Sequence, residues 1–361
     1  MTQAVQQLVR AAAVYDEQGM RDSVRRLTRI GAACLPVLRP LMHHEDANVR
    51  WQALIVVGRI GEPDAPWLGP LLQAMQDADA DVRGEAVSAA AGLFPGNRRV
   101  RVMIVALQND AHPVVRVRAY AADWMLRQPK RSVTALIGLL QDRDWMAARM
   151  AEHSLVNIGP PAVPGLVAVL EHGDARHRES AVRILGYLSQ VPTDVLQRIH
   201  ELAAVPEPGL ADAAMEALAR SGRPGWLILK NLAGSQHPDV RTRAFRAAAD
   251  VSAWQVDLLP VLNAGLDDRV PRVRLAAMAT LRRLRIGNRK SLERLSPLLQ
   301  SPTADHRAAA VAAIGGLGRL SGTALTRLRD MSRDDPVDYI RRHARQIVEQ
   351  STAANGFVSD P

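Results

Sequence analysis

Aromatic residues make up only 4% of this 361-residue sequence, and cysteine occurs once, at Cys34. A lone cysteine forms no intramolecular disulfide and builds no zinc site by itself, which fits a reducing compartment. The N-terminal stretch contains Arg10 and has no unbroken apolar segment typical of a secretion signal, and the later apolar runs are too short or too interrupted to cross a bilayer. We therefore expect a soluble cytoplasmic protein that does not associate with membranes.

What the sequence does contain is small aliphatic residues, because 47% of it is hydrophobic despite the few aromatics. Alanine and leucine favour helices, and small side chains let helices approach closely. Valine and isoleucine are also plentiful, so propensity alone does not exclude strands. A chain of this length is too long for one compact core unless that core is extended lengthwise.

Positive charge is concentrated near the C-terminal end. The formal net charge is +9, with 26 Lys/Arg against 25 Asp/Glu in residues 1–240 but 20 against 11 in residues 241–350. Nearly all of these cations are arginine, since lysine occurs only at positions 130, 230 and 290. The last third is therefore the natural place to look for a surface that binds an anionic partner.

A short phrase recurs along the chain: a small polar or acidic lead-in, Val-Arg, two variable residues and Ala. The clear copies place their arginines at Arg50, Arg83, Arg116, Arg241 and Arg274, and the first three are spaced by 33 residues. Weaker copies continue the frame, with arginines at Arg149, Arg178, Arg307 and Arg341. A fixed period of this length indicates a repeat architecture.

Each repeat contains two helical patterns. The first is short and often begins with proline, as at Pro36, Pro164 and Pro260, which suits the first turn of a helix. The second begins at the Val-Arg phrase, and its apolar residues follow helical spacing. One such pair cannot bury its apolar face alone, so neighbouring pairs must stack. We predict an all-α solenoid of about ten antiparallel helix pairs.

The phrase Asp46–Gly61, followed by Pro66–Leu72, resembles HEAT repeats, in particular the bacterial PBS-lyase HEAT-like variant. The resemblance covers residues 20–349 and implies that the second helices line a concave face and the first helices a convex one. We expect residues 1–20 to form a helix that caps the stack and residues 350–361 to form a disordered tail. The motif is specific for architecture but not for function.

The resemblance also suggests a structural role for the repeated arginines. In HEAT-like stacks the arginine pairs with an acid in the loop of a neighbouring repeat, and Asp46, Asp79, Asp81 and Asp239 are the acids we expect here. A residue repeated in every unit serves the stacking that all units share. This predicted structural ladder comprises Arg50, Arg83, Arg116, Arg149, Arg241, Arg274 and Arg307.

Residues outside the consensus are better candidates for binding a partner or a polyanion. We select Arg118, Arg243, Arg246, Arg272, Arg282, Arg283, Arg285 and Trp51. The alternative interpretation is that these arginines form a solvated face and that Trp51 fills space between repeats. Among large rings, only Phe245 and Trp254 lie near the C-terminal arginines in sequence, so stacking on nucleic-acid bases is not expected.

The sequence predicts a non-enzymatic protein-binding scaffold or adaptor with a basic C-terminal third. The main alternative is binding to the phosphate backbone of nucleic acid through the same arginines. A remote alternative is an enzyme subunit, such as a bilin lyase or a DNA glycosylase. We predict no catalytic residue, cofactor or metal site, because the His/acid pairs such as His43-His44-Glu45 and Glu152-His153 are scattered along the chain.

Overall fold

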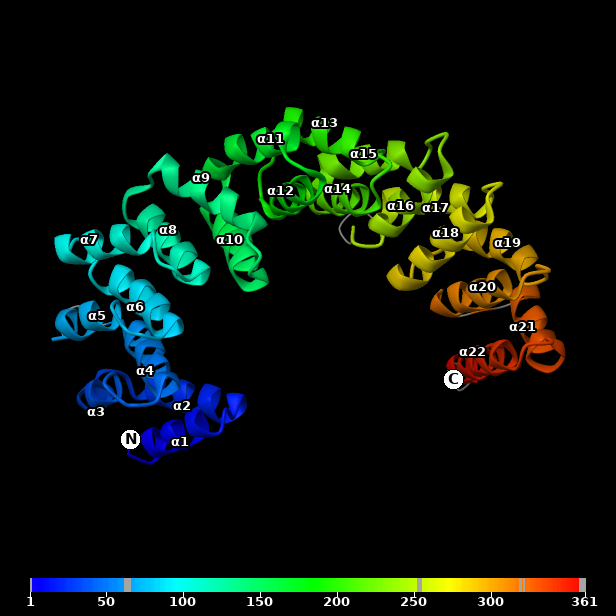
Figure 1. Ribbon diagram of the computed structural model, residues 1–361. Coiled ribbons are helices and arrows are strands. Elements are labelled where there is room, and N and C mark those ends of the chain that lie inside the picture. Colours follow the sequence, from blue (N-terminus) through cyan, green and yellow to red (C-terminus); the bar gives the residue numbers. More distant parts are fainter. Residues whose placement is uncertain (1, 62–65, 252–254, 318–319, 321, 357–361) are drawn as a thin grey trace. The chain divides into compact units, whose positions relative to one another are not determined.

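The computed structural model describes residues 2–61, 66–251, 255–317, 320 and 322–356. Within these ranges the regular elements are helices, and no strand is present. The helices divide into two compact units, residues 1–172 and 173–361. The predicted all-α architecture of stacked antiparallel helix pairs is confirmed, and the described helices are labelled α1 to α22 in chain order (Figure 1).

The first unit contains eleven α-helices among the described residues. They are α1 (Thr2–Ala13), α2 (Glu17–Ile30), α3 (Leu35–Leu41), α4 (Ala47–Ile60), α5 (Leu68–Ala74), α6 (Ala80–Leu93), α7 (Arg98–Leu107), α8 (Pro113–Arg127), α9 (Lys130–Gly138), α10 (Trp145–Ile158) and α11 (Val163–His172). Short 3-10 turns, Gly31–Cys34, Leu139–Gln141 and Pro160–Ala162, adjoin α3, α9 and α11.

The second unit continues the alternation of first and second helices. Its described helices are α12 (Ala175–Tyr187), α13 (Thr193–Leu202), α14 (Pro208–Arg220), α15 (Gly222–Leu232), α16 (Pro238–Ala248), α17 (Gln255–Leu266), α18 (Pro271–Leu284), α19 (Arg289–Leu298), α20 (Ala304–Gly316), α21 (Thr323–Asp334) and α22 (Asp338–Gly356).

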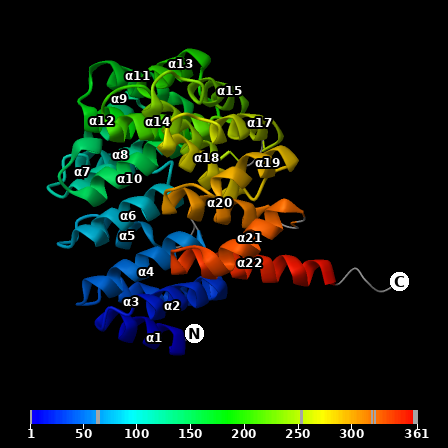
Figure 2. The same ribbon diagram turned by 90° about the vertical axis from the view of Figure 1, so that its right-hand side faces the viewer.

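The even-numbered helices form one layer in each unit, which we call the even-helix layer. In the first unit α4, α6, α8 and α10 pack on one another in order. In the second unit α12, α14, α16, α18, α20 and α22 do the same. The odd-numbered helices form the other layer, as α17, α19 and α21 illustrate (Figure 2). The Val-Arg phrases therefore start the helices of a single layer.

Local capping explains where the even-numbered helices begin. Asp79 precedes α6 in an extended conformation, and its carboxylate accepts hydrogen bonds from the backbone N–H groups of Asp81 and Val82. Asp46 and Asp144 cap α4 and α10 in the same way. Such caps satisfy N–H groups that have no partner inside the helix. Elsewhere a proline occupies the first turn, as in α8, α16 and α18.

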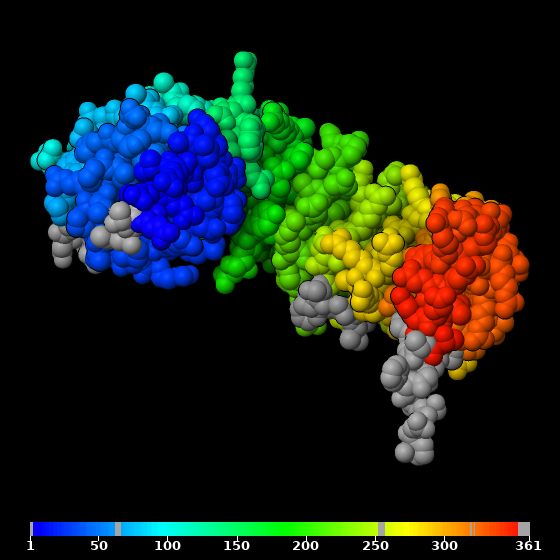
Figure 3. Space-filling model, turned by 90° about the horizontal axis from the view of Figure 1, so that it is seen from below, coloured from blue at the N-terminus to red at the C-terminus, as the bar shows by residue number. Residues whose placement is uncertain are grey.

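Small residues let neighbouring even-numbered helices approach closely. A Cβ atom at Gly186 in α12 would lie 2.6 Å from the Cα atom of Ala217 in α14, so only glycine fits there. In α6 the alanines at positions 86, 89, 90 and 91 are buried in the same layer. The helices nearest the N-terminus, drawn in blue, form a closely packed body in the space-filling view (Figure 3). The alanine-rich composition thus reflects tight helix packing.

The two ends of the chain differ from the expected boundaries. A single capping helix was predicted for residues 1–20, but α1 ends at Ala13 and Asp16 caps a new helix, α2, which pairs with α1. At the other end α22 extends to Gly356, so residues 350–356 of the predicted tail are helical. Residues 357–361 lie outside the described part of the chain.

In the described part of the chain, no single helix combines the length and apolar composition needed to cross a membrane. One bent pair, Trp145–Ile158 with Pro160–His172, meets those criteria by length and composition only.

Candidate functional site in the even-helix layer

The repeated arginines connect successive repeats through a fixed pattern of hydrogen bonds. Arg50 Nε and Nη2 donate to the two carboxylate oxygens of Asp77 at 2.8 Å each. Arg50 Nη1 donates to the backbone carbonyls of His44 and Glu45, also at 2.8 Å. Bidentate pairing fixes both groups in one orientation. The same bidentate arrangement joins Arg83 to Asp110, Arg241 to Asp268 and Arg307 to Asp335.

Each aspartate also links its own turn to the following helix. Asp77 accepts a hydrogen bond from the backbone N–H of Asp79, and its carbonyl accepts one from Arg83. Burial alone would raise the pKa of Asp77, but the hydrogen bonds from Arg50 and from the backbone outweigh burial and hold the pKa below its usual value. The Nε, Nη1 and Nη2 atoms of Arg50 each donate to an acceptor inside the protein.

The carboxylates of this ladder are not the ones expected from the sequence. Asp46 and Asp79 cap their own helices, Asp81 is exposed, and Asp239 pairs with Arg272. The actual partners are Asp77, Asp110, Asp142, Asp268 and Asp335. A recognisable pattern was available, because Asp77, Asp110, Asp268 and Asp335 each lie six residues before the arginine of the next repeat, whereas Asp142 lies six residues before Ala148.

Arg149 does not belong to the ladder. Asp144 caps α10, and the residue four positions after the cap, where the other repeats place their arginine, is Ala148. Arg149 is exposed and forms no ion pair among the described residues. The spacing of 33 residues misplaced it because the preceding repeat is one residue shorter, as the separation of Asp110 and Asp142 shows.

The ladder is interrupted at Arg274. Its Nη1 atom donates to the carbonyls of Asp268 and Arg269, as in the other repeats. The position of the expected aspartate, six residues before Arg307, is occupied by Ser301. The Nε atom of Arg274 is buried without a hydrogen-bond partner, and its Nη2 atom lies 3.5 Å from Nε2 of His306.

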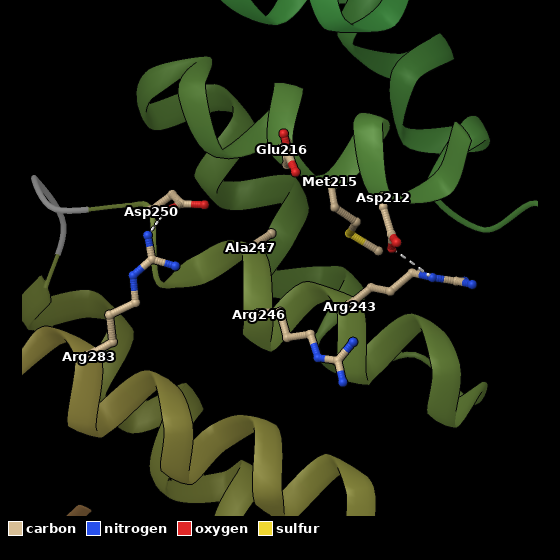
Figure 4. A pocket seen from close by; sticks show the side chains of 8 residues that line it. All are labelled: Asp212, Met215, Glu216, Arg243, Arg246, Ala247, Asp250 and Arg283. Carbon is tan, nitrogen blue, oxygen red and sulfur yellow. Dashed lines mark hydrogen bonds and ion pairs between the residues drawn. The ribbon is translucent and has the colours of Figure 1, made fainter. Parts of the chain in front are cut away.

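Three of the predicted binding arginines, Arg243, Arg272 and Arg283, pair with acids of the preceding repeat, and two of these pairs lie at one hollow. Arg243 Nε lies 3.1 Å from an Asp212 carboxylate oxygen, and Arg283 pairs with Asp250. Figure 4 shows both pairs around a hollow of about 250 Å³, with Arg246 between them and joined to neither. Glu216 also lines this hollow. Equal numbers of arginines and acids line it, so it is not strongly electropositive.

Two more of the predicted binding residues are held in the first unit by their neighbours. Arg118 donates to Glu85 at 2.6 Å and to Ser88 at 3.2 Å, and its Cδ atom would lie 2.8 Å from a Cβ atom at Gly84. Trp51 is half-buried against the core of the first unit, and its indole N–H is buried without a partner. Arg118 therefore bridges adjacent repeats, and Trp51 packs against the core. Trp254 lies outside the described residues.

Arg282 and Arg285 lie at a second hollow, which we call the α18–α22 hollow. It has a volume of about 640 Å³ and is lined by Arg282, Arg283, Arg285, Ala312, Gly315, Gly316, His343, Gln346, Ile347 and Gln350. These residues come from α18 and the residue that ends it, from α20, and from α22. No acidic side chain lines this hollow, in contrast to the hollow at Arg246.

Side chains that could hold a metal ion do not converge in the described part of the chain. No cluster of three or more His, Cys, Asp or Glu side chains suited to a metal ion is found there. Cys34 is buried, and its Sγ atom lies 3.1 Å from the Gly31 carbonyl and 3.4 Å from that of Leu27. Burial raises the pKa of the Cys34 thiol, which keeps it protonated and inert.

A protein-family model described as HEAT repeats matches residues 5–91, 36–122, 226–314 and 259–349. The resemblance to HEAT repeats found in the sequence is thereby confirmed. No curated protein matches the chain in sequence.

Solved structures with the same fold include Kap121p, at 14% identity and a TM-score of 0.56 over 98% of this chain, and Kap121p bound to Pho4p, at 14% identity and 0.57 over 94%. The chain spans 44% and 42% of those two chains, respectively, which is less than half their length. At such low identity these similarities show the fold alone.

Proposed function

This chain belongs to the family of HEAT-repeat proteins, and on that premise we propose that it is a non-enzymatic scaffold that binds a protein through its even-helix layer. The observation that carries the proposal is that the arginines fall into two groups, one paired within the protein and one free of ion pairs in the described residues. The ladder arginines such as Arg50 form ion pairs between repeats. Arg246, Arg282 and Arg285 instead line hollows of the even-helix layer and form no ion pair in the described residues.

A stack of this kind leaves a long surface of side chains that its own folding does not use. The even-helix layer of the second unit exposes arginine there, and arginine is enriched at protein interfaces. The structure of Kap121p bound to Pho4p supports the proposal by example, because a similar helical stack holds a protein in it.

Nucleic acid is the second candidate, supported by the surplus of arginine in residues 241–350. Phosphate-backbone binding needs a row of cations along the strand. Asp212, Glu216 and Asp250 interrupt such a row in the second unit, since they line the hollow at Arg246. The charge pattern therefore favours a protein partner with discrete acidic groups.

The test is affinity capture from the native cell extract, with and without nuclease, using the wild-type chain, Arg246→Glu and Arg285→Glu. We expect the same protein to be captured after nuclease treatment and each substitution to reduce its recovery. Arg289→Glu is the matched control, because the Arg289 side chain on α19 is 93% exposed and pairs only with Glu293 of its own helix. Recovery of nucleic acid alone, or equal recovery by all variants, would contradict the proposal.

A further inference from the structure

The α18–α22 hollow has the chemistry of a carboxylate-binding site. We propose that it binds an acidic peptide segment of the partner, with Arg282 and Arg285 as the cationic ligands of Asp or Glu side chains. The inference rests on the proposed scaffold function and adds to it the kind of partner and the place of contact.

The hollow exists because α20 presents only small side chains between two larger neighbours. Ala312, Gly315 and Gly316 form its floor. A Cβ atom at Gly316 would lie 3.4 Å from Cα and from the carbonyl oxygen of Arg282, and one at Gly315 would lie 2.6 Å from Cδ1 of Ile347. Gly315 thus lets Ile347 of α22 pack close to α20, and the small residues Ala312 and Gly316 add little bulk to the hollow that they line.

The charge of the hollow is unbalanced. Arg282 and Arg285 are exposed and make no ion pair among the described residues, while Arg283 is paired with Asp250. Two guanidinium groups at one opening, without a lining carboxylate, create a positive potential that an incoming carboxylate would neutralise. Arginine binds carboxylates through parallel hydrogen bonds, which gives such a contact geometric specificity.

The backbone at Arg285 is unusual in the same place. Arg285 ends α18 with φ 51°, one of three non-glycine residues with positive φ in the described chain. At the equivalent ends of α4 and α10, Gly61 and Gly159 adopt positive φ. A residue with a side chain is less favourable than glycine in this conformation, which Gln128 also adopts at the end of α8. The turn at Arg285 places a cationic side chain in the lining of the hollow.

The opposite wall supplies polar groups of the right kind. His343, Gln346 and Gln350 lie on one face of α22, at intervals of three and four residues. Burial, together with the nearby charge of Arg282, lowers the pKa of His343, so its imidazole is neutral at pH 7 and donates a single N–H. Amide and imidazole N–H groups complement the lone pairs of a carboxylate that the arginines leave free.

A peptide fits this site better than a nucleic-acid strand. The Arg246 hollow shares Arg283 with the α18–α22 hollow, and its carboxylates at Asp212, Glu216 and Asp250 would repel the next phosphates of a strand. No aromatic side chain lines either hollow for base stacking. An extended peptide instead can place an acidic side chain in the α18–α22 hollow and basic or neutral ones beyond it.

The test is fluorescence anisotropy with a labelled peptide in which one Asp and one Glu are flanked by neutral residues, and with a matched peptide that has Asn and Gln in their place. We expect the wild-type chain to bind the acidic peptide and not the neutral one. The double variant Arg282→Glu/Arg285→Glu should bind at least about tenfold more weakly, since each lost charge-assisted contact is worth roughly 1.5–3 kcal/mol. Arg289→Glu changes net charge outside the hollow and should stay within about twofold of wild type.

A second variant separates shape from charge. Ala312→Leu fills the floor of the hollow without altering any charge, and it should also weaken peptide binding. Circular dichroism and the melting temperature confirm that each variant is folded before binding is compared. Loss of binding in both Ala312→Leu and the double arginine variant, with retention in Arg289→Glu, would support the site.

Two other outcomes would overturn the inference, and they differ in whether they also refute the scaffold proposal. Failure of the wild-type chain to bind the acidic peptide at low salt, while it still captures a protein from extract, refutes the hollow but not the scaffold. Duplex DNA that displaces the peptide, with affinity falling by about 0.9 log units per log unit of salt for each phosphate contacted, refutes both.

Discussion

Arg83 in α6 donates two hydrogen bonds to the carboxylate of Asp110, which lies before α8: one from Nε at 2.9 Å and one from Nη2 at 2.8 Å. The side chains are only 16% and 9% exposed. Asp110 in turn accepts the backbone N–H of His112, and its carbonyl accepts a hydrogen bond from Arg116. The Arg83–Asp110 pair therefore joins two successive repeats. Asp110 also fixes the turn before α8, the helix that carries the next arginine, Arg116.

Removing the carboxylate of this pair should destabilise the first unit. Asp110→Ala leaves the Arg83 guanidinium partly buried without its partner and deprives His112 of its acceptor. We expect the free energy of unfolding to fall by about 2–4 kcal/mol, slightly less than the roughly 3–5 kcal/mol for a fully buried pair, because both side chains keep some exposure. Urea unfolding followed by circular dichroism measures the change. Asp81→Ala is the control, because Asp81 is exposed and should change stability by less than about 0.5 kcal/mol.

Completing the ladder at its gap should stabilise the second unit. Ser301→Asp places a carboxylate where the other repeats have one, facing the orphaned Nε of Arg274. We expect a gain of about 1 kcal/mol, as for a hydrogen bond to a charged group less the cost of desolvation. Ser301→Asn keeps an acceptor without the charge and should gain less. A double-mutant cycle with Arg274→Gln attributes the gain to the pair; an equal gain in the Arg274→Gln background would contradict this explanation.

The ladder also predicts how stability depends on pH. The pKa values of Asp77, Asp110, Asp268 and Asp335 lie below their usual value; in each case burial raises the pKa, and the arginine and backbone hydrogen bonds outweigh it. An unfolded chain therefore takes up protons on these groups before the folded one does. Their contribution is fully present well above about pH 4 and is lost as the pH falls through the lowered folded-state values.

Urea unfolding between neutral pH and about pH 3 tests this expectation. The wild-type free energy of unfolding should decrease below about pH 4, and Asp110→Asn should show a shallower decrease in the same range because it has lost one of the titrating groups. His343 adds a smaller loss that begins below about pH 6.5, since its folded-state pKa is lowered by burial and by Arg282. Parallel pH curves for Asp110→Asn and wild type would contradict the assignment.

The repeat period and the helical periodicity were sufficient to predict the helix pairs, because both reflect local sequence. The partners in the ladder were not predicted, since the nearby acids Asp46 and Asp79 serve as helix caps, and the acid that pairs with Arg50 lies 27 residues further along, in the next repeat. A cap and a salt bridge require the same residue type. The structure assigns Asp79 to the cap and Asp77 to the ion pair.

Which of the selected arginines remain free to bind a partner could not be predicted from the sequence. Arg243, Arg272 and Arg283 were selected by their charge, and each is paired with an acid about 30 residues earlier. Linear charge counts cannot reveal neutralisation across repeats. The α18–α22 hollow depends on absent side chains at Gly315 and Gly316, a feature that a search for charged or aromatic residues overlooks.

Glycines in the even-helix layer should respond oppositely to the same substitution. Gly186→Ala adds a methyl group 2.6 Å from the backbone of Ala217, which forces α12 and α14 apart. The cost of overpacking, about 1–3 kcal/mol, exceeds the helix-propensity gain of about 1 kcal/mol, so the second unit should lose stability. Gly92→Ala in α6 meets nothing within 4 Å and should stabilise the first unit by roughly 0.5–1 kcal/mol. Thermal unfolding of the two variants beside wild type measures both effects; a rise in melting temperature for Gly186→Ala would mean that α12 and α14 do not pack at the contact distance found here.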